Sequence, residues 1–297
     1  MKLTSQQTAI IEALARYKYL TNTQFALVIG APYHSLRRAT AKLATIPEKS
    51  PLLKAKKFPV HARAGRLEYV YRLGKYGQEV AAGLGMIDES YAVGASVYEL
   101  DFFHRKAVIT FRILLDQALT ESKQYRVTRY ENYFEKTGAN NRKDGGPRLA
   151  AVTRVSFPDG TFFIPDSVFI TVAIGKKWQA LFALEYVRGN KKTRTLHQIK
   201  KHMTAMATGV VTKRYGIPTG QDYVALFLFE DEALRDRVLT ALESQLKFNP
   251  FREHFLFASF TDARIHIRGC WRKVKNSEYL YDFIDGKQAF RVRSPTS

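Results

Sequence analysis

Hydrophobic residues in the N-terminal quarter recur at helical spacing in three short segments. Residues 4–17 place their apolar side chains along one side of a helix, and Thr4 followed by Gln7 matches a capping box. A second helix is predicted over residues 21–30. A third begins at Pro32, because proline is favoured at the first position of a helix. Three short helices in this order, with a tight turn before the third, are typical of a helix-turn-helix.

An alternating β pattern follows the three helices. Two β-rich pieces flank the dipeptide Ala64-Gly65, which predicts a basic β-hairpin over residues 51–77. Helices followed by such a hairpin predict a winged helix-turn-helix domain, which we assign to residues 1–90.

The remaining residues change from helix to strand and back several times. A long amphipathic helix is predicted over 97–122, a strand from 125, a loop over 138–149, and three antiparallel strands over 151–187. Sharp turns are expected at Pro158-Asp159-Gly160 and at Gly175-Lys176. Two further helix–strand pairs complete the chain. This order predicts an α+β protein whose residues 97–297 form a restriction-endonuclease-like, PD-(D/E)xK-type α/β sandwich with a mixed sheet.

The net charge of the chain indicates which class of binding partner is expected. The 297 residues include 47 Lys and Arg against 27 Asp and Glu, a net charge of +20. A balance this basic favours a polyanion, and double-stranded DNA before a membrane surface. The excess is concentrated in two zones, with +11 in residues 1–75 and +8 in residues 186–214.

The two basic zones supply the candidate DNA-binding residues. Arginines of the third helix can read guanine in a major groove, while basic side chains of the hairpin can neutralise phosphates. The alternative is a solvated helix face that binds nothing. The candidates are Tyr33, His34, Ser35, Arg37, Arg38 and Lys42 on the helix, Lys54, Lys56, Lys57, Arg63 and Arg66 on the hairpin, and Arg188, Lys191, Lys192 and Arg194 in the second zone.

Two acidic residues lie at the ends of adjacent predicted strands. If Gly175 and Lys176 form the hairpin turn, paired residue numbers sum to 351, and Asp166 lies opposite Glu185. Two facing carboxylates repel, so we expect a cation beside them: Mg²⁺ or Mn²⁺, or an arginine or lysine. Nucleases of this type place a lysine two residues after the glutamate, where this chain has Val187. Lys200 on the next helix is the candidate replacement.

A structural role is the alternative for the same pair. Asp166 would then cap a strand, while Glu185 would pair with Arg188 or Arg154. No phosphate-binding loop is present, and we interpret His197 and His202, five residues apart, as surface groups on a basic helix. The single cysteine, Cys270, excludes an internal disulfide. With no signal core and no long apolar run, a cytoplasmic protein without a membrane segment is expected.

Several motifs resemble the replication-relaxation family, which includes MobC-like mobilisation proteins of plasmids. These are the N-terminal helices and hairpin, "FHRKAVITFRILLD" at 103–116, "FFIPDSVFI" at 162–170 and "FALEYVRGNKKTRTLHQIK" at 182–200. The family's second acidic position is Val187 here. The resemblance implies a relaxosome accessory protein that binds DNA at a transfer or replication origin.

These patterns together favour one function and leave two alternatives. The favoured one is a homodimeric double-stranded DNA-binding protein that assists a relaxase or coupling protein in plasmid transfer, with no catalytic role of its own. The first alternative is a metal-dependent endonuclease using Asp166, Glu185 and Lys200. The second is a winged-helix transcriptional repressor.

Overall fold

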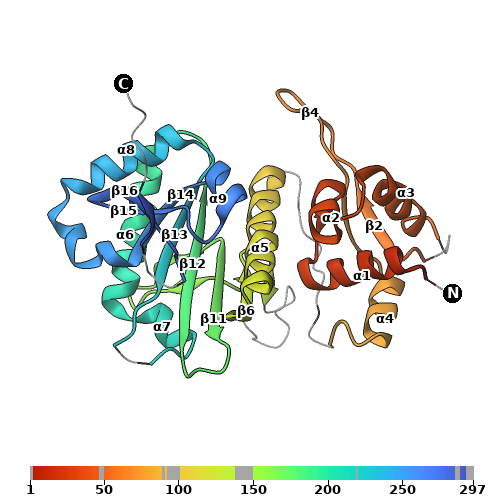
Figure 1. Ribbon diagram of the computed structural model, residues 1–297, viewed down its shortest axis with the longest axis horizontal. Helices are drawn as coiled ribbons and strands as arrows, with labels where there is room; N and C mark the ends of the chain where they lie inside the picture. The colour runs from red at the N-terminus through yellow and green to blue at the C-terminus, as the bar shows by residue number, and fades with distance from the viewer. Residues whose placement is uncertain are drawn as a thin grey trace. The chain divides into compact units, whose positions relative to one another are not determined.

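The computed structural model describes residues 3–46, 50–88, 91, 101–137, 150–218, 220–284 and 288–291 (Figure 1). The chain is an α+β protein with a mixed sheet. It divides into two compact units, Met1–Ile113 and Leu114–Ser297, and the division falls inside helix α5 (Phe102–Ser122). The loop expected over 138–149, and the junction expected between residues 90 and 97, lie largely or wholly outside the described residues.

The first unit begins with the helices that the apolar pattern predicts. They are α1 (Ser5–Tyr17), α2 (Asn22–Ile29) and α3 (Tyr33–Leu43), and α4 (Lys75–Gly83) follows the hairpin. The capping box of Thr4 and Gln7 is present, and Thr21 with Gln24 forms a second one. Gly30 ends α2 at φ 71°, a left-handed conformation that glycine adopts without steric cost.

Strands of the first unit form a small sheet with a long extension. Its three strands are β1 (Leu20–Thr21), β5 (Val70–Leu73) and β2 (Leu53–Lys56), in the order β1-β5-β2. Between β2 and β5 the chain continues into β3 (Val60–His61) and β4 (Gly65–Arg66), which pair with each other. Figure 1 shows β4 near the tip of this projecting hairpin. The ring Nδ1 of His61 accepts hydrogen bonds from the backbone N–H groups of Arg63 and Ala64, which fixes the turn.

The second unit is built on an eight-stranded mixed sheet in the order β17-β16-β15-β14-β13-β12-β11-β6. Strands β12, β13 and β14 run parallel, and the other neighbours are antiparallel. The strands are β6 (Tyr125–Asn132), β11 (Ser167–Ala173), β12 (Gln179–Val187), β13 (Val224–Phe229), β14 (Phe255–Ser259), β15 (Trp271–Lys273), β16 (Asn276–Tyr281) and β17 (Gln288–Arg291).

The predicted strand over residues 151–157 is wrong. This segment contributes only short pairs outside the main sheet: β8 (Ala150–Ala151) with β7 (Lys136–Thr137), and β9 (Val155–Ser156) with β10 (Phe162–Phe163). Strand β6 takes the place beside β11 instead. Turn residues in the segment keep its extended pieces to two residues each, so β6, with eight, provides the longer edge.

Helices cover one face of this sheet and form the core with it. They are α6 (Lys192–Thr208), α7 (Val210–Arg214), α8 (Glu232–Glu243) and the 3-10 helix η2 (Leu246–His254). Helix α9 (Phe260–His266) follows β14, and the ring of its Phe260 lies 5.7 Å from that of Tyr186, which points to the opposite face. Ile199 of α6 and Val238 of α8 are buried with Phe227 and Phe257 of the sheet in one cluster. Each such side chain contributes about 1.5–3 kcal/mol when fully buried. Within the described residues, no helix has the length and apolar content needed to cross a membrane.

The hairpin of β11 and β12 has the predicted register. Ser167 lies opposite Leu184 and Val172 opposite Gln179, so paired numbers sum to 351. The predicted loop length of two residues is wrong. The N–H of Ala173 donates a hydrogen bond to the carbonyl oxygen of Trp178 at 3.0 Å, so the loop comprises the four residues 174–177. Both loops have the same centre, and the register is therefore unchanged.

Candidate functional site

Asp166 and Glu185 face α6 from neighbouring strands. Continuing the observed register by one residue beyond Ser167 and Leu184 places Asp166 opposite Glu185. Both side chains point to the face that packs on α6, because they alternate with Ser167 and Leu184 along their strands. Asp166 is 8% exposed and Glu185 is 2% exposed. The two carboxylates are therefore neighbours in the interior of the unit.

Asp166 links β11 to β12 by hydrogen bonds at the start of β11. Its Oδ2 accepts a hydrogen bond of 2.7 Å from the backbone N–H of Tyr186, and its own N–H donates to Leu184 O at 3.0 Å. Its carbonyl oxygen accepts a hydrogen bond from the N–H of Tyr133. These contacts give Asp166 a structural role at the strand start, as the alternative prediction describes.

Glu185 is held by two residues of α6. Its Oε2 accepts a hydrogen bond of 3.1 Å from the Gln198 side chain, and its Oε1 lies 3.0 Å from His202 Nε2. Gln198 and His202 are four residues apart, so they project from the same side of the helix. Arg188 pairs with Glu230 instead, at 3.5 Å.

His202 is not the surface group that its spacing from His197 suggested. Its side chain is fully buried, with ring contacts to Phe163 at 5.0 Å and Phe227 at 5.6 Å between centroids. Its Nδ1 lies 2.8 Å from the hydroxyl oxygen of Tyr223, which is buried as well. The chain therefore carries a buried polar network of Asp166, Glu185, Gln198, His202 and Tyr223.

Burial keeps this network uncharged at its centre. Burial raises the pKa of Glu185 well above its usual range, and the neighbouring Asp166 raises it further, while Arg194 and Lys201 lower it in part. Burial lowers the pKa of His202 to about 3. Both shifts favour a protonated Glu185 that donates to a neutral His202 ring, since an unscreened charge is costly in the interior.

The same arrangement fixes the other hydrogen-bond donors. When protonated Glu185 donates a hydrogen bond to Nε2 of His202, the neutral ring carries its single proton on Nδ1 and donates a hydrogen bond from there to the Tyr223 hydroxyl oxygen. The Tyr223 hydroxyl then donates to the carbonyl oxygen of His202 at 3.3 Å. Every polar atom in this chain of hydrogen bonds has a partner, which is the condition for a stable buried network.

In this arrangement the pair does not fit a divalent cation. Both oxygens of Glu185 have protein partners, and one oxygen of Asp166 accepts from the backbone. Val187, at the position of the water-orienting lysine, is buried. In the parts of the chain that are described, no cluster of three or more His, Cys, Asp or Glu side chains suits a metal ion.

Lys200 lies away from the acidic pair. It is exposed on α6 and borders a separate hollow with Met203 and Leu246. The basic residues that influence Glu185 electrostatically are Arg194 and Lys201, and the ammonium group of Lys201 donates to the carbonyl oxygen of Phe162 at 3.3 Å. Helix α6 therefore brings Gln198 and His202, and not the predicted Lys200, to the carboxyl group of Glu185.

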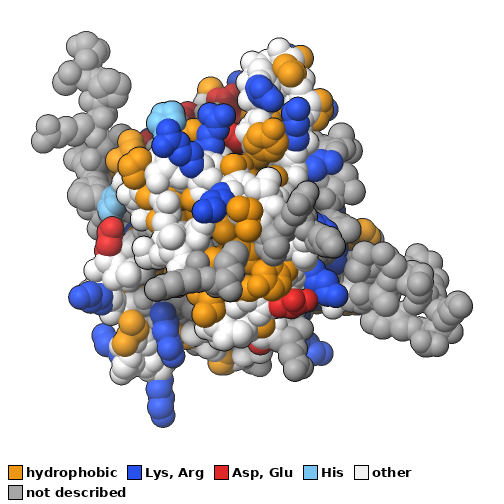
Figure 2. Space-filling model, turned by 90° about the vertical axis from the view of Figure 1, so that its right-hand side faces the viewer, with side chains coloured by type: hydrophobic (Ala, Val, Ile, Leu, Met, Phe, Trp, Pro, Cys, Tyr) orange, Lys and Arg blue, Asp and Glu red, His pale blue; other side chains and the backbone are white. Residues whose placement is uncertain are grey.

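The candidate DNA-binding residues of the first unit are almost all at the surface. Ser35 is the exception, because it is partly buried and exchanges hydrogen bonds with Gln6 of α1 at 2.9 and 3.2 Å. Figure 2 shows the side of the molecule at the right of Figure 1, where Lys and Arg side chains are widely spread and acidic ones are sparse. The exposed residues are Tyr33, His34, Arg37, Arg38 and Lys42 on α3, and Lys54, Lys56, Lys57, Arg63 and Arg66 on the hairpin.

The second basic zone surrounds the start of α6. Arg188 is exposed before the helix, Lys191 is its N-cap residue, and Lys192 and Arg194 are exposed in its first turn. Backbone N–H groups at a helix start favour anions, and the four side chains add to that effect.

The sequence contained evidence that His202 is buried, but the interpretation based on its spacing from His197 overlooked it. Thr195, Ile199, His202 and Met206 follow helical spacing and are all buried, so the histidine belongs to the apolar stripe of α6. Gln198, four residues before it, adds the second donor. No local pattern indicated Tyr223, which reaches the network from the residue before β13.

A comparison with models of protein families finds no match to this chain, and comparisons with curated proteins and with solved structures find none either.

Proposed function

We propose that the protein binds double-stranded DNA through its first unit, as an accessory factor in plasmid or mobile-element transfer or replication. One observation carries the proposal: Arg37, Arg38 and Lys42 are exposed on α3, and the basic hairpin residues are exposed on the hairpin that follows α3 in the same unit. A surface with this excess of cations attracts a polyanion and gains affinity through release of counterions.

The order of elements in the first unit supports a winged-helix interpretation. Helix α1 is followed by β1, α2 and α3, and strands β2 and β5 then complete a three-stranded sheet with β1, with a hairpin projecting between β2 and β5. In this interpretation α3 enters the major groove, where Arg37 and Arg38 provide bidentate donors for guanine. Lys54, Lys57 and Arg63 contact phosphates, which adds affinity without sequence preference.

The accessory role follows from the resemblance to MobC-like proteins. In this proposal the second unit has a PD-(D/E)xK-like fold without hydrolytic activity, and it holds a relaxase or coupling protein. A homodimer would place two copies of α3 on a repeated or palindromic site. The buried, protein-bonded Glu185 supports a structural use of the acidic pair.

Duplex affinity at several salt concentrations tests the proposal. A labelled duplex titrated with the full chain should give a strongly salt-dependent affinity, and Lys54→Gln/Lys57→Gln should reduce the slope of log K against log salt by about 1.8, at about 0.9 per phosphate contact. Arg237→Gln/Lys247→Gln removes the same charge from exposed sites of the second unit and serves as the control. Equal slopes for wild type and the hairpin variant would reject the proposed surface.

The alternative of a metal-dependent endonuclease rests on the juxtaposition of Asp166 and Glu185. Supercoiled plasmid incubated with the protein in Mg²⁺ or Mn²⁺ decides this point. Cleavage that disappears in Asp166→Ala would establish the enzyme, and intact plasmid with wild type would exclude it.

A footprint over a promoter, with no protection of a transfer origin, would favour the second alternative, a transcriptional repressor.

A further inference from the structure

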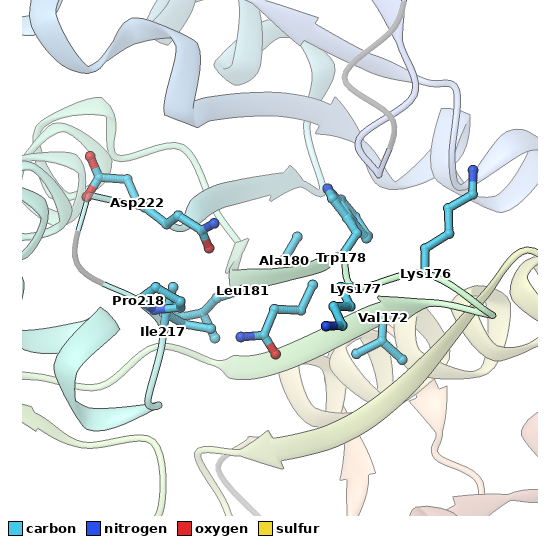
Figure 3. Close-up of a pocket in the computed structure, with 11 residues that line it drawn as sticks. Val172, Lys176, Lys177, Trp178, Ala180, Leu181, Ile217, Pro218 and Asp222 are labelled. Atoms are coloured by element: carbon cyan, nitrogen blue, oxygen red, sulfur yellow. The ribbon is translucent and has the colours of Figure 1, made fainter.

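A hollow of about 620 Å³ lies beside the turn of the β11–β12 hairpin (Figure 3). Apolar side chains of Val172, Leu181, Ile217 and Pro218 form part of its lining. Charged and amide side chains form much of the rest, so the lining is mixed, and a hollow of this size can hold a small organic molecule with polar groups. The hollow shares no lining residue with the network around Glu185, so its chemistry is independent of that network.

Trp178 provides an aromatic surface at one end of the hollow. Figure 3 shows its indole ring standing at the margin, with the side chain of Lys176 extending beside it. The ring is 38% exposed, and Tyr125 holds it from the side at 5.4 Å between centroids, at an angle of 62°. An exposed tryptophan with a fixed orientation is suited to stacking on a flat ring, because little freedom is lost on binding.

Opposite charges mark the two ends of the hollow. Lys176 and Lys177 precede Trp178 and line the hollow, with Lys176 on the same side of β12 as the indole ring in Figure 3 and Lys177 on the other, whereas Asp222 lies at the far end. Asp222 also lies 3.7 Å from Nε2 of His254. The side-chain amides of Gln179 and Gln221 line the hollow as well. A ligand with an anionic group at one end and N–H donors at the other would satisfy both ends.

We propose that this hollow binds one unpaired nucleotide. The base stacks on the exposed ring of Trp178, its phosphate meets Lys176, and N–H donors on the base edge face Asp222. The chemical class is a phosphorylated nucleoside, either free or within single-stranded DNA. This site does not rest on duplex binding by the first unit, and it would let the second unit hold a strand opened from a duplex.

Quenching of tryptophan fluorescence measures ligand binding at this site directly. The chain has two tryptophans, and Trp271 is fully buried, so quenching by an added nucleotide reports on Trp178. Deoxycytidine monophosphate and a short oligodeoxycytidine are titrated separately. Saturable quenching by both supports a site for the nucleotide itself, and quenching by the oligonucleotide alone identifies the strand as the ligand. The absence of saturable quenching with both probes overturns the proposal.

Variants separate this site from general attraction to a basic protein. Trp178→Ala should weaken oligonucleotide binding, measured by anisotropy of a labelled strand, about tenfold, and Trp178→Phe should restore most of it. Lys176→Gln/Lys177→Gln should weaken binding more than Arg237→Gln/Lys247→Gln, which removes equal charge elsewhere in the unit. Circular dichroism confirms folding of each variant. Wild-type affinity in Trp178→Ala, or equal losses in the two double variants, contradicts the proposal.

The same titrations distinguish this site from the duplex-binding surface. Arg37→Ala/Arg38→Ala should keep the quenching by the oligonucleotide, since both residues belong to the first unit. Loss of quenching in that variant, with its fold intact, would place strand binding in the first unit and overturn the assignment to Trp178.

Discussion

The two candidate sites place their ionisable groups in opposite environments. In the first unit, Arg37, Arg38 and the hairpin lysines are exposed to solvent, where a charge costs little and remains available to a partner. In the second unit, Glu185 and His202 are buried, and each has its polar atoms engaged by protein groups. Exposed charges of one sign indicate binding, whereas buried, mutually satisfied groups indicate a contribution to stability.

The comparison explains why an acidic pair alone is a weak sign of catalysis. Asp166 and Glu185 are adjacent, as a metal site requires, yet their oxygens are engaged by Tyr186, Gln198 and His202. A catalytic carboxylate must be available to a metal or a substrate. Changes that separate stability from binding therefore test the contrast between the two regions.

The largest effect is expected from His202→Ala. The change removes a buried ring, leaves Glu185 and Tyr223 without their shared partner, and opens a cavity among aromatic side chains. We expect a loss of about 3 kcal/mol or more in the free energy of unfolding, measured by urea denaturation. His197→Ala, on the exposed side of the same helix, should change it by less than about 0.5 kcal/mol. Similar values for the two variants would mean that the network does not stabilise the unit.

The dependence of stability on pH should be smaller and distinctive. Because folding raises the pKa of Glu185, the folded protein keeps this proton at pH values where the unfolded chain has lost it. The contribution of Glu185 to the free energy of unfolding is therefore full below about pH 4.5 and declines as pH rises through the folded pKa. His202 acts in the opposite direction, because folding lowers its pKa to about 3 and stability is lost as pH falls from 6.5. Above pH 6.5 the contribution of His202 is constant, and the decline due to Glu185 continues up to its folded pKa, at up to about 1.4 kcal/mol per pH unit.

Glu185→Gln checks this assignment because it cannot titrate. Urea midpoints of wild type measured between pH 6.5 and 9 should decline more steeply than those of the variant. Parallel curves would show that Glu185 is already ionised in the folded protein over this pH range.

The smallest effect concerns the basic zone at the start of α6. Lys191→Gln/Lys192→Gln/Arg194→Gln should flatten the salt dependence of duplex binding by at most about 0.9 per lost phosphate contact, with less effect on affinity than changes in α3. Salt titrations of anisotropy measure the slope. An unchanged slope would confine duplex binding to the first unit and sharpen the contrast between the two.

Local and nearest-neighbour features were predictable from the sequence. Thr4 and Gln7 identified the first cap, Gly30 the end of α2, and the centre of the Gly175-Lys176 turn fixed which residues of β11 and β12 are opposed. Each depends on interactions among residues close in sequence or on the two-residue period of a strand. The opposition of Asp166 and Glu185 follows from the same register.

Features that depend on distant packing were not predictable in this way. The place beside β11 was assigned to residues 151–157, although β6 occupies it, because periodicity does not reveal which strands pair. Burial of His202 depends on Tyr223, twenty-one residues later, and on aromatic rings from β13 and β14. A polar residue inside an apolar stripe becomes informative only when its partner is known.

Duplex binding by three proteins tests the central contrast most directly. Wild type, Arg37→Ala/Arg38→Ala and Glu185→Gln are titrated with the same labelled duplex in a buffer containing Mg²⁺, and the strands are then examined on a denaturing gel. We predict that the arginine variant binds about tenfold or more weakly, that Glu185→Gln binds as wild type does, and that all strands remain intact. Wild-type affinity in the arginine variant, or strand cleavage that Glu185→Gln abolishes, would contradict the account.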